Sequence, residues 1–255
     1  MGRARTLRGR TGQIIDRLAT EYPGTAEDLC ALDHDGPFQL LAATILSAQT
    51  TDERVNMVTP ALFKRYPEPE DLARAEPEQV EEIVRSTGFF RAKTRSLIGM
   101  AQAVSERFGG RVPTAMAKLT TIPGVGRKTA NVVRSVAFGL PGLPVDTHVG
   151  RISRLLGLTA QTDPVRVEAE LDRLVPPGER GTFSLRLILH GRRICIARRP
   201  RCEACVLVDL CPSAQLPLGV APPSAVAPAS IVAGFVAPPT TVKAKTSAKG
   251  TARSR

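Results

Sequence analysis

Apolar residues recur at helical spacing from about residue 11 to residue 193, and no segment shows the sustained alternation of a half-buried strand. Proline or glycine stands at most junctions of this pattern, as in short connections between packed helices. The sequence therefore predicts an all-α protein. The expected helices occupy residues 11–22, 38–46, 51–65, 77–86, 91–108, 127–138, 147–156, 164–174 and 182–193.

Three of the expected helices begin with a residue that can cap the free backbone amides. Thr50 and Glu53 have the spacing of a capping box, and Asp163 stands before a proline at the first helical position. Asp146 precedes the apolar-periodic stretch that begins at Val149, so we expect its carboxylate to cap that helix.

The composition indicates a soluble protein with a polyanionic partner. The chain has 255 residues, 42% of them apolar, which suffices for one or two compact domains. No stretch approaches the roughly 18 apolar residues of a membrane-spanning helix, so we expect no membrane association. The formal net charge of +11 favours a partner such as nucleic acid.

Much of this charge lies at the two ends of the chain. We expect residues 1–10, with four arginines, to form a basic arm. Residues 213–255 hold ten alanines, six prolines, five basic residues and no acid, so we expect a disordered tail. The tail is either a weak electrostatic tether for DNA or a solubilising extension.

Four of the five cysteines fall within 17 residues, with the spacing Cys-x6-Cys-x2-Cys-x5-Cys; they are Cys195, Cys202, Cys205 and Cys211. The chain begins without the apolar segment of a secretory signal, so we expect an intracellular protein, in which disulfides are rare. The cluster thus predicts a metal centre. Four thiolates suit either Zn²⁺ or an iron–sulfur cluster, and their spacing alone does not decide between them.

Residues 119–130 have the pattern of a short helix, a glycine hairpin and a second helix. Gly124 and Gly126 leave the backbone amides open, and the dipole of the second helix adds to the attraction for an anion. A DNA phosphate would suit this place, although an ordinary turn between two helices has the same pattern.

Lys128 and Asp146 are the candidate catalytic residues. The helix dipole at Lys128 favours the neutral amine, which is a nucleophile suited to C1′ of a deoxyribose and to a Schiff base. An ionised Asp146 could stabilise the oxocarbenium character that develops as a glycosidic bond breaks. The alternatives are a lysine that only pairs with phosphate and an aspartate that only caps its helix.

The hairpin at residues 122–133, the segment Val145-Asp146-Thr147-His148 and the cysteine pattern together resemble the endonuclease III family. This family of helix-hairpin-helix DNA glycosylases has AP-lyase activity, and the resemblance covers about residues 11–212. It implies two helical lobes with a DNA cleft between them. Residues 36–147 would form a six-helix barrel, and residues 11–35 with 148–212 would form the metal-binding lobe.

The resemblance also implies roles for single residues. Lys128 takes the Schiff-base position and Asp146 the position of the catalytic aspartate. The four cysteines would hold one structural [4Fe–4S] cluster, whose loss should unfold that lobe. Gln49 would fill the space that a flipped base leaves, and Phe89, where relatives often have an aliphatic residue, would wedge the opposite strand. Phosphates would contact the loop at Arg198, Arg199 and Arg201.

The predicted function is therefore removal of oxidised pyrimidines and cleavage of abasic sites by β-elimination. We expect a monomer acting on damaged double-stranded DNA, in the cytoplasm at a bacterial nucleoid. Two alternatives are weaker. A mismatch glycosylase for adenine or thymine usually lacks the hairpin lysine, and a non-catalytic helix-hairpin-helix protein would not need Lys128 together with Asp146.

Overall fold

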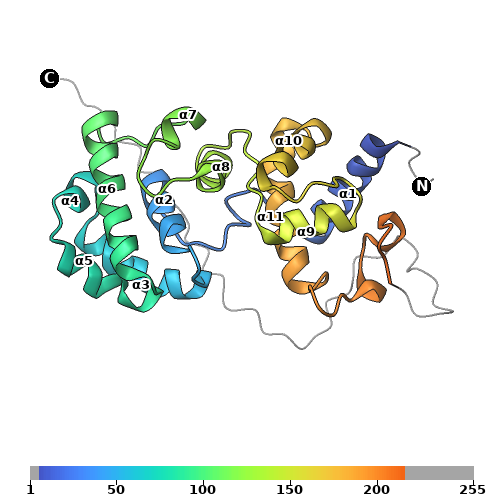
Figure 1. The fold of residues 1–255 in the computed structure, drawn as a ribbon, viewed down its shortest axis with the longest axis horizontal. Helices are drawn as coiled ribbons and strands as arrows, with labels where there is room; N and C mark the ends of the chain where they lie inside the picture. The colour runs from blue at the N-terminus through green and yellow to red at the C-terminus, as the bar shows by residue number, and fades with distance from the viewer. Residues whose placement is uncertain (1–5, 216–255) are drawn as a thin grey trace, which may run out of the picture. The chain divides into compact units, whose positions relative to one another are not determined.

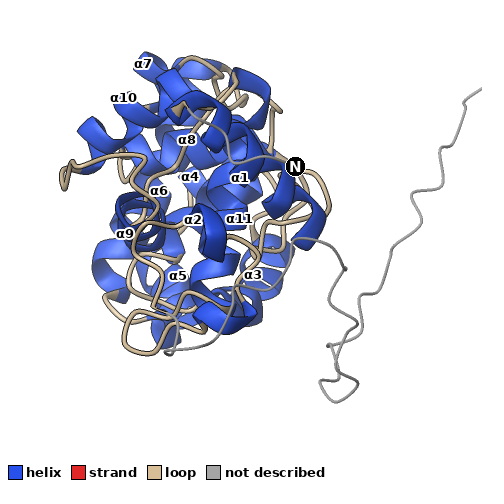
Figure 2. Cartoon of the chain, turned by 90° about the vertical axis from the view of Figure 1, so that its right-hand side faces the viewer, coloured by secondary structure: helices blue, strands red, loops and turns tan. Residues whose placement is uncertain are grey.

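The computed structural model describes residues 6–215, and within that range every regular element is a helix (Figure 2). The all-α prediction is confirmed. The α-helices are α1 (Leu7–Glu21), α2 (Pro37–Leu46), α3 (Asp52–Arg65), α4 (Pro69–Ala73), α5 (Pro77–Val84), α6 (Phe90–Phe108), α7 (Met116–Leu119), α8 (Arg127–Val136), α9 (Thr147–Leu155), α10 (Pro164–Leu174) and α11 (Arg180–Arg193). Short 3₁₀ turns are η1 (Arg85–Thr87), η2 (Pro177–Glu179), η3 (Cys202–Ala204) and η4 (Val208–Leu210).

Local capping explains which helix starts could be predicted. Asp163 caps α10, accepting from the amide of Arg166 at 2.9 Å, as predicted. The capping box predicted at Thr50 is wrong, because Thr51 caps α3 instead and the Thr50 hydroxyl donates to the carbonyl of Thr87. Helix α1 begins at Leu7, within residues 1–10, which were predicted to form a basic arm.

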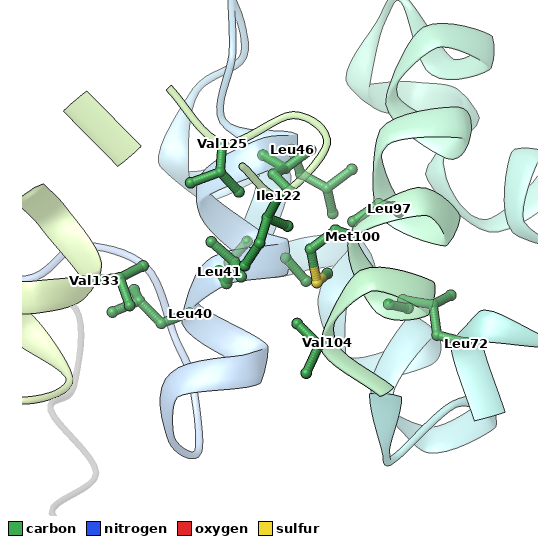
Figure 3. Packing of buried hydrophobic residues seen from close by; sticks show 14 of the residues in the cluster. Leu40, Leu41, Leu46, Leu72, Leu97, Met100, Val104, Ile122, Val125 and Val133 are labelled. Atoms are coloured by element: carbon green, nitrogen blue, oxygen red, sulfur yellow. The ribbon is translucent and has the colours of Figure 1, made fainter. Parts of the chain in front are cut away.

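A first hydrophobic core is built by helices α2 to α8. Helices α2 and α6 contribute its centre, where Leu40, Leu41, Leu97 and Met100 are fully buried (Figure 3). Buried leucine side chains of this kind contribute about 1.5–3 kcal/mol each, so this core is the main source of stability for this part of the chain.

A second hydrophobic core is formed by α1, α9, α10 and α11 together with the segment that leads into α9. Phe183 on α11 is its largest fully buried side chain. The chain therefore contributes its N-terminal helix and its last third to one core, and the residues between them to the other (Figure 1).

Ion pairs join the elements of the two cores. Arg127 at the start of α8 forms a two-bond pair with Glu168 of α10, with N···O distances of 2.7 and 2.9 Å. Arg192 of α11 pairs with Asp52 of α3 at 2.9 Å. The lobe boundaries at residues 36, 147 and 212 stay predictions.

Residues 1–5 and 216–255 lie outside the described range, so the basic arm and the tail predicted there stay predictions. Within residues 6–215, no helix has the length and apolarity needed to cross a membrane.

Candidate functional site

The glycine hairpin lies between α7 and α8 and uses its two glycines differently. Gly124 has φ 77°, and a Cβ there would lie 2.8 Å from the Cβ of Ser96, so both conformation and space require glycine. Gly126 has φ −86°, and a Cβ there would meet no atom within 4 Å. The protein itself therefore does not require a missing side chain at Gly126, which leaves its backbone open to an approaching molecule.

Helix α8 starts just after this hairpin without a side-chain cap. Its first amides therefore have no side-chain cap as acceptor, which is usual at an anion site. Lys128 is exposed in the first turn, whereas Ala130 and Val133 on the inner face of the helix are fully buried. The preceding Arg127 is tied to Glu168, so the start of the helix is anchored while Lys128 is free to meet solvent.

Asp146 caps α9, as predicted, and its Oδ1 accepts from the amide of Val149 at 2.8 Å. The residues before it pack directly on α8, because the side-chain amide of Asn131 donates to the carbonyl of Leu143 at 3.3 Å. A Cβ at Gly142 would lie 2.5 Å from the carbonyl oxygen of Asn131, which measures how closely the two segments approach. Asp146 is thereby held on the segment that crosses the lysine-bearing helix.

The pKa of His148 is affected by the charges of both candidate residues. Burial lowers the pKa of His148, the negative charge of Asp146 opposes this, and the positive charges of Arg151, Arg192 and Lys128 lower it further. Lys128 and Asp146 thus both act electrostatically on one imidazole. His148 is partly buried and packs against Gly191, where a Cβ would lie 2.6 Å from its Nδ1. The histidine is therefore packed against α11.

Gln49 and Phe89 share an unusual backbone conformation. Their φ angles are 55° and 48°, and no other non-glycine residue between 6 and 215 has a positive φ. Left-handed backbone costs an ordinary residue about 1–2 kcal/mol, and such strain is concentrated at functional sites. Both side chains are exposed, and Phe89 keeps 70% of its surface in solvent. Both loops thus hold a solvent-facing side chain in a strained position.

Sequence reasoning missed Lys93, which lies buried beneath these two loops with 5% exposure. Its ammonium donates to the hydroxyl of Thr50 at 2.6 Å and to the carbonyl of Thr87 at 2.7 Å. The sequence held one signal, because Lys93 occupies the apolar stripe of α6 that continues with Leu97 and Met100.

Five arginines lie between residues 192 and 201, two at the end of α11 and three in the loop that follows it, and the first two already have partners. Arg192 pairs with Asp52, and Arg193 lies over the ring of Tyr22 at 5.8 Å. The remaining three, Arg198, Arg199 and Arg201, are exposed and make no ion pair with residues 6–215. These three are therefore the arginines of this segment that stay available to an anion.

The four clustered cysteines line one cavity of about 300 Å³ between α9, the end of α11 and the turns η3 and η4. Between residues 6 and 215, no three side chains of His, Cys, Asp or Glu converge as ligands of one metal ion. The four cysteines instead line one common space, and four cysteine sulfurs are the donor set of an iron–sulfur cluster. The residues present therefore fit such a group.

Several N–H groups surround these sulfurs. The amide of Leu207 donates to Cys205 Sγ at 3.4 Å, the amide of Gln215 to Cys202 Sγ at 3.5 Å, and the guanidinium of Arg151 to Cys195 Sγ at 3.6 Å. Donors of this kind stabilise thiolates. Burial raises the pKa of Cys205 to about 12, so metal binding at this sulfur has to displace a proton.

Comparison with known proteins adds a family to this geometry. The family model described as "HhH-GPD superfamily base excision DNA repair protein" matches residues 42–177, and the "Iron-sulfur binding domain of endonuclease III" matches residues 195–211. The chain is similar to endonuclease III of Synechocystis sp., with 52% identity over 81% of this chain and 93% of that protein. It is 42% identical to endonuclease III of Bacillus subtilis over 79% of this chain and 91% of that protein. The chain belongs to the endonuclease III family.

Solved structures agree with this membership. The fold is similar to that of a non-covalent complex of endonuclease III with DNA, with a TM-score of 0.75, 38% identity, and coverage of 81% of this chain and 96% of that one. A trapped covalent intermediate of endonuclease III with DNA gives a TM-score of 0.75 and 39% identity, with the same coverage of both chains. The predicted helix-hairpin-helix glycosylase fold is confirmed.

Family membership defines the class of enzyme and the cofactor. This endonuclease III homologue is a base-excision DNA glycosylase and AP lyase. Its matched iron–sulfur domain begins at Cys195 and ends at Cys211, and its cofactor is a structural [4Fe–4S] cluster, as predicted. The comparisons thus decide between zinc and an iron–sulfur cluster, which the cysteine spacing had left open.

Proposed function

We propose that this enzyme removes oxidised pyrimidines from double-stranded DNA and cleaves the resulting abasic sites, with Lys128 as the nucleophile and Asp146 as its partner. The observation that carries the proposal is that Lys128, exposed in the first turn of α8, and Asp146, the cap of α9, lie on two segments that pack directly on each other. The charges of this exposed amine and this partly exposed carboxylate both act on the pKa of His148.

The chemistry follows from these two groups. The neutral amine of Lys128 attacks C1′ of an extruded nucleotide, so that a C–N bond forms and the N-glycosidic bond breaks. The departing base keeps the bonding electrons and takes up a proton, while the attacking nitrogen loses one. The carboxylate of Asp146 stabilises the positive charge that develops at the sugar and accepts the proton from the lysine nitrogen.

The lyase step uses the imine that this attack produces after the sugar ring opens. A base removes a proton from C2′, the electrons form a C2′–C3′ double bond, and the 3′ phosphate leaves. Water then hydrolyses the imine and restores the lysine. The protein is required chiefly to hold the opened sugar beside the amine, since the imine itself withdraws the electrons.

DNA would be bound by three sets of groups. The open amides around Gly124 and Gly126 and the start of α8 suit one phosphate, and the free arginines at positions 198, 199 and 201 suit others. The exposed side chains of Gln49 and Phe89 suit the space left by the extruded nucleotide. We propose that the enzyme acts as a monomer on damaged DNA at the nucleoid.

We propose Cys195, Cys202, Cys205 and Cys211 as the ligands of the [4Fe–4S] cluster. When bound, the cluster supplies a rigid cross-link for a segment that contains only the short turns η3 and η4. The segment supplies the cavity, the N–H donors to sulfur and the exposed arginines. Its contribution to catalysis is to hold those arginines in place for DNA.

Covalent trapping tests the role of Lys128. The holoenzyme is mixed with a thymine-glycol duplex or an abasic duplex in the presence of borohydride, which reduces an imine to a stable protein–DNA adduct. We expect adduct with both duplexes, and at least about a 100-fold loss in Lys128→Ala. Lys118→Ala is the matched control, because Lys118 is another exposed lysine close to the hairpin, on α7.

The same assay separates the alternatives. Undiminished trapping in Lys128→Ala would remove this lysine from the mechanism. Single-turnover release of adenine or thymine from mismatched duplexes, without activity on thymine glycol, would favour a mismatch glycosylase. Binding without cleavage of either duplex would favour a DNA-binding protein without catalysis.

A further inference from the structure

We propose that Lys93 is a positioning residue that fastens the Gln49 loop to the Phe89 loop, so that both side chains enter DNA together when a nucleotide is extruded. This inference rests on the proposed function, because it concerns how the same site opens the duplex. It assigns a role to a residue that does not touch the reacting atoms.

The contacts of Lys93 reach both loops at once. Its ammonium donates to the hydroxyl of Thr50, next to Gln49, at 2.6 Å, and to the carbonyl of Thr87, two residues before Phe89, at 2.7 Å. The hydroxyl of Thr50 donates to the same carbonyl of Thr87 at 2.5 Å. We call the three hydrogen bonds that join Lys93, Thr50 and Thr87 the clasp. The backbone amide of Lys93 also donates to the carbonyl of Phe89 at 3.1 Å.

The hydrogen bonds of the Lys93 ammonium are strong because the group is buried and has no carboxylate partner among the described residues. Lys93 is 5% exposed and forms no ion pair with any described residue, so neutral oxygens alone satisfy it. Burial without a carboxylate lowers the pKa of Lys93. A buried charge is tolerated only where hydrogen bonds replace its water, and charge-assisted bonds are about twice as strong as neutral ones.

The clasp lies where two strained positions need support. Gln49 and Phe89 have left-handed backbone, which neither residue prefers, and both side chains face solvent. Neither side chain is held by burial, so the conformation has to be imposed from the backbone side. Lys93 supports Gln49 through its hydrogen bond to Thr50. It supports Phe89 through its hydrogen bond to Thr87 and through the hydrogen bond from its own backbone amide to the carbonyl of Phe89.

A fixed pair of inserting side chains matters for duplex DNA and not for a single strand. Extrusion from a duplex requires one residue to fill the gap while another separates the opposite strand, and displacement of a reacting group by about 1 Å can cost 100-fold in rate. An abasic site in a single strand has no opposite base and no stack to open. Loss of the clasp should therefore affect the two substrates unequally.

The experiment compares Lys93→Met with wild-type holoenzyme under single-turnover conditions. Methionine keeps the apolar stem and removes the amine. We expect excision of thymine glycol from duplex DNA to fall by between about 10- and 100-fold, while cleavage of a single-stranded abasic oligonucleotide changes by less than about twofold. Lys64→Met, at an exposed lysine of α3, is the matched control and should leave both rates unchanged.

A binding measurement reports insertion without any chemistry. A duplex carries a tetrahydrofuran abasic analogue, which the enzyme cannot cleave, with 2-aminopurine in the opposite strand. Wild-type protein should increase the fluorescence by unstacking the 2-aminopurine, and Lys93→Met should lose most of this increase at saturating protein. Lys93→Arg, which keeps a buried donor, should recover part of it.

Thr50→Val tests the clasp from its other side and serves if Lys93→Met does not fold. It should lower the duplex-to-single-strand rate ratio in the same direction, and its effect should not add to that of Lys93→Met in the double variant. An unchanged ratio in both variants, or an equal loss on both substrates, would overturn the role of Lys93. Failure of the wild-type enzyme to cleave either substrate would instead overturn the proposed function.

Discussion

The hairpin before α8 and the loops that carry Gln49 and Phe89 reach positive φ in opposite ways. In the hairpin, the left-handed position is taken by Gly124, which has no side chain and therefore bears no strain. In the two loops, the left-handed positions are taken by residues with large exposed side chains. The left-handed conformation thus causes no strain in the hairpin, whereas it destabilises the two loops that carry Gln49 and Phe89.

This difference in strain fits two kinds of contact with DNA, one made by the backbone of the hairpin and one made by the side chains of the two loops. Where the backbone would contact DNA, a side chain would obstruct the phosphate, so glycine suits both the conformation and the contact. Where the side chain would contact DNA, the strain has to be accepted and supported from beneath, which is the place of Lys93. Substitutions at the two regions should therefore shift stability in opposite directions.

Gly124→Ala should give the largest change in stability. The new Cβ would impose a left-handed strain of about 1–2 kcal/mol and approach the Cβ of Ser96 to 2.8 Å. Crowding of a packed site adds about 1–3 kcal/mol, so we expect the free energy of unfolding to fall by about 2–5 kcal/mol. Urea denaturation of the holoenzyme measures it, and a fall below about 0.5 kcal/mol would show that the hairpin adapts without strain.

Phe89→Asn should raise the free energy of unfolding by about 0.5–1 kcal/mol, because asparagine tolerates the left-handed region and Phe89 buries little surface. We also expect excision of thymine glycol from duplex DNA to fall by about tenfold, since the apolar wedge is lost. Phe89→Leu is the control, because it keeps an apolar side chain and the strain, and should change neither quantity much. A variant that becomes less stable would contradict the assignment of strain to this position.

Locally encoded features could be predicted from the sequence. The start of α10 follows from the carboxylate of Asp163 before a proline, and the start of α9 from Asp146, since a cap needs only the next three residues. Helix α4 was missed, because its five residues are too few to show a helical period. The tandem Thr50-Thr51 gave the wrong cap, since a distant carbonyl and not the local spacing decides which hydroxyl is free.

Features that depend on distant partners could not be predicted. Lys93 and Thr50 are 43 positions apart, and Arg192 meets Asp52 from the other core. The positive φ of Gln49 could not be predicted either, because glutamine rarely adopts a left-handed backbone. The resemblance to a family indicates the candidate site, whereas the hydrogen bonds of Lys93 beneath the Gln49 and Phe89 loops depend on the three-dimensional fold.

Gly126→Ala should change stability least. It tests the difference between the two hairpin glycines, because only Gly124 has a positive φ and close neighbours. Its φ of −86° suits alanine and its Cβ would meet no atom within 4 Å, so we expect the free energy of unfolding to change by less than about 0.5 kcal/mol. The methyl group would instead obstruct a phosphate at the start of α8. We expect affinity for the tetrahydrofuran duplex to fall by about tenfold, and the dependence of log K on log salt to lose about one unit of slope. An unchanged affinity and slope would mean that no phosphate approaches this glycine, and the hairpin would then be an ordinary turn that requires glycine only at position 124.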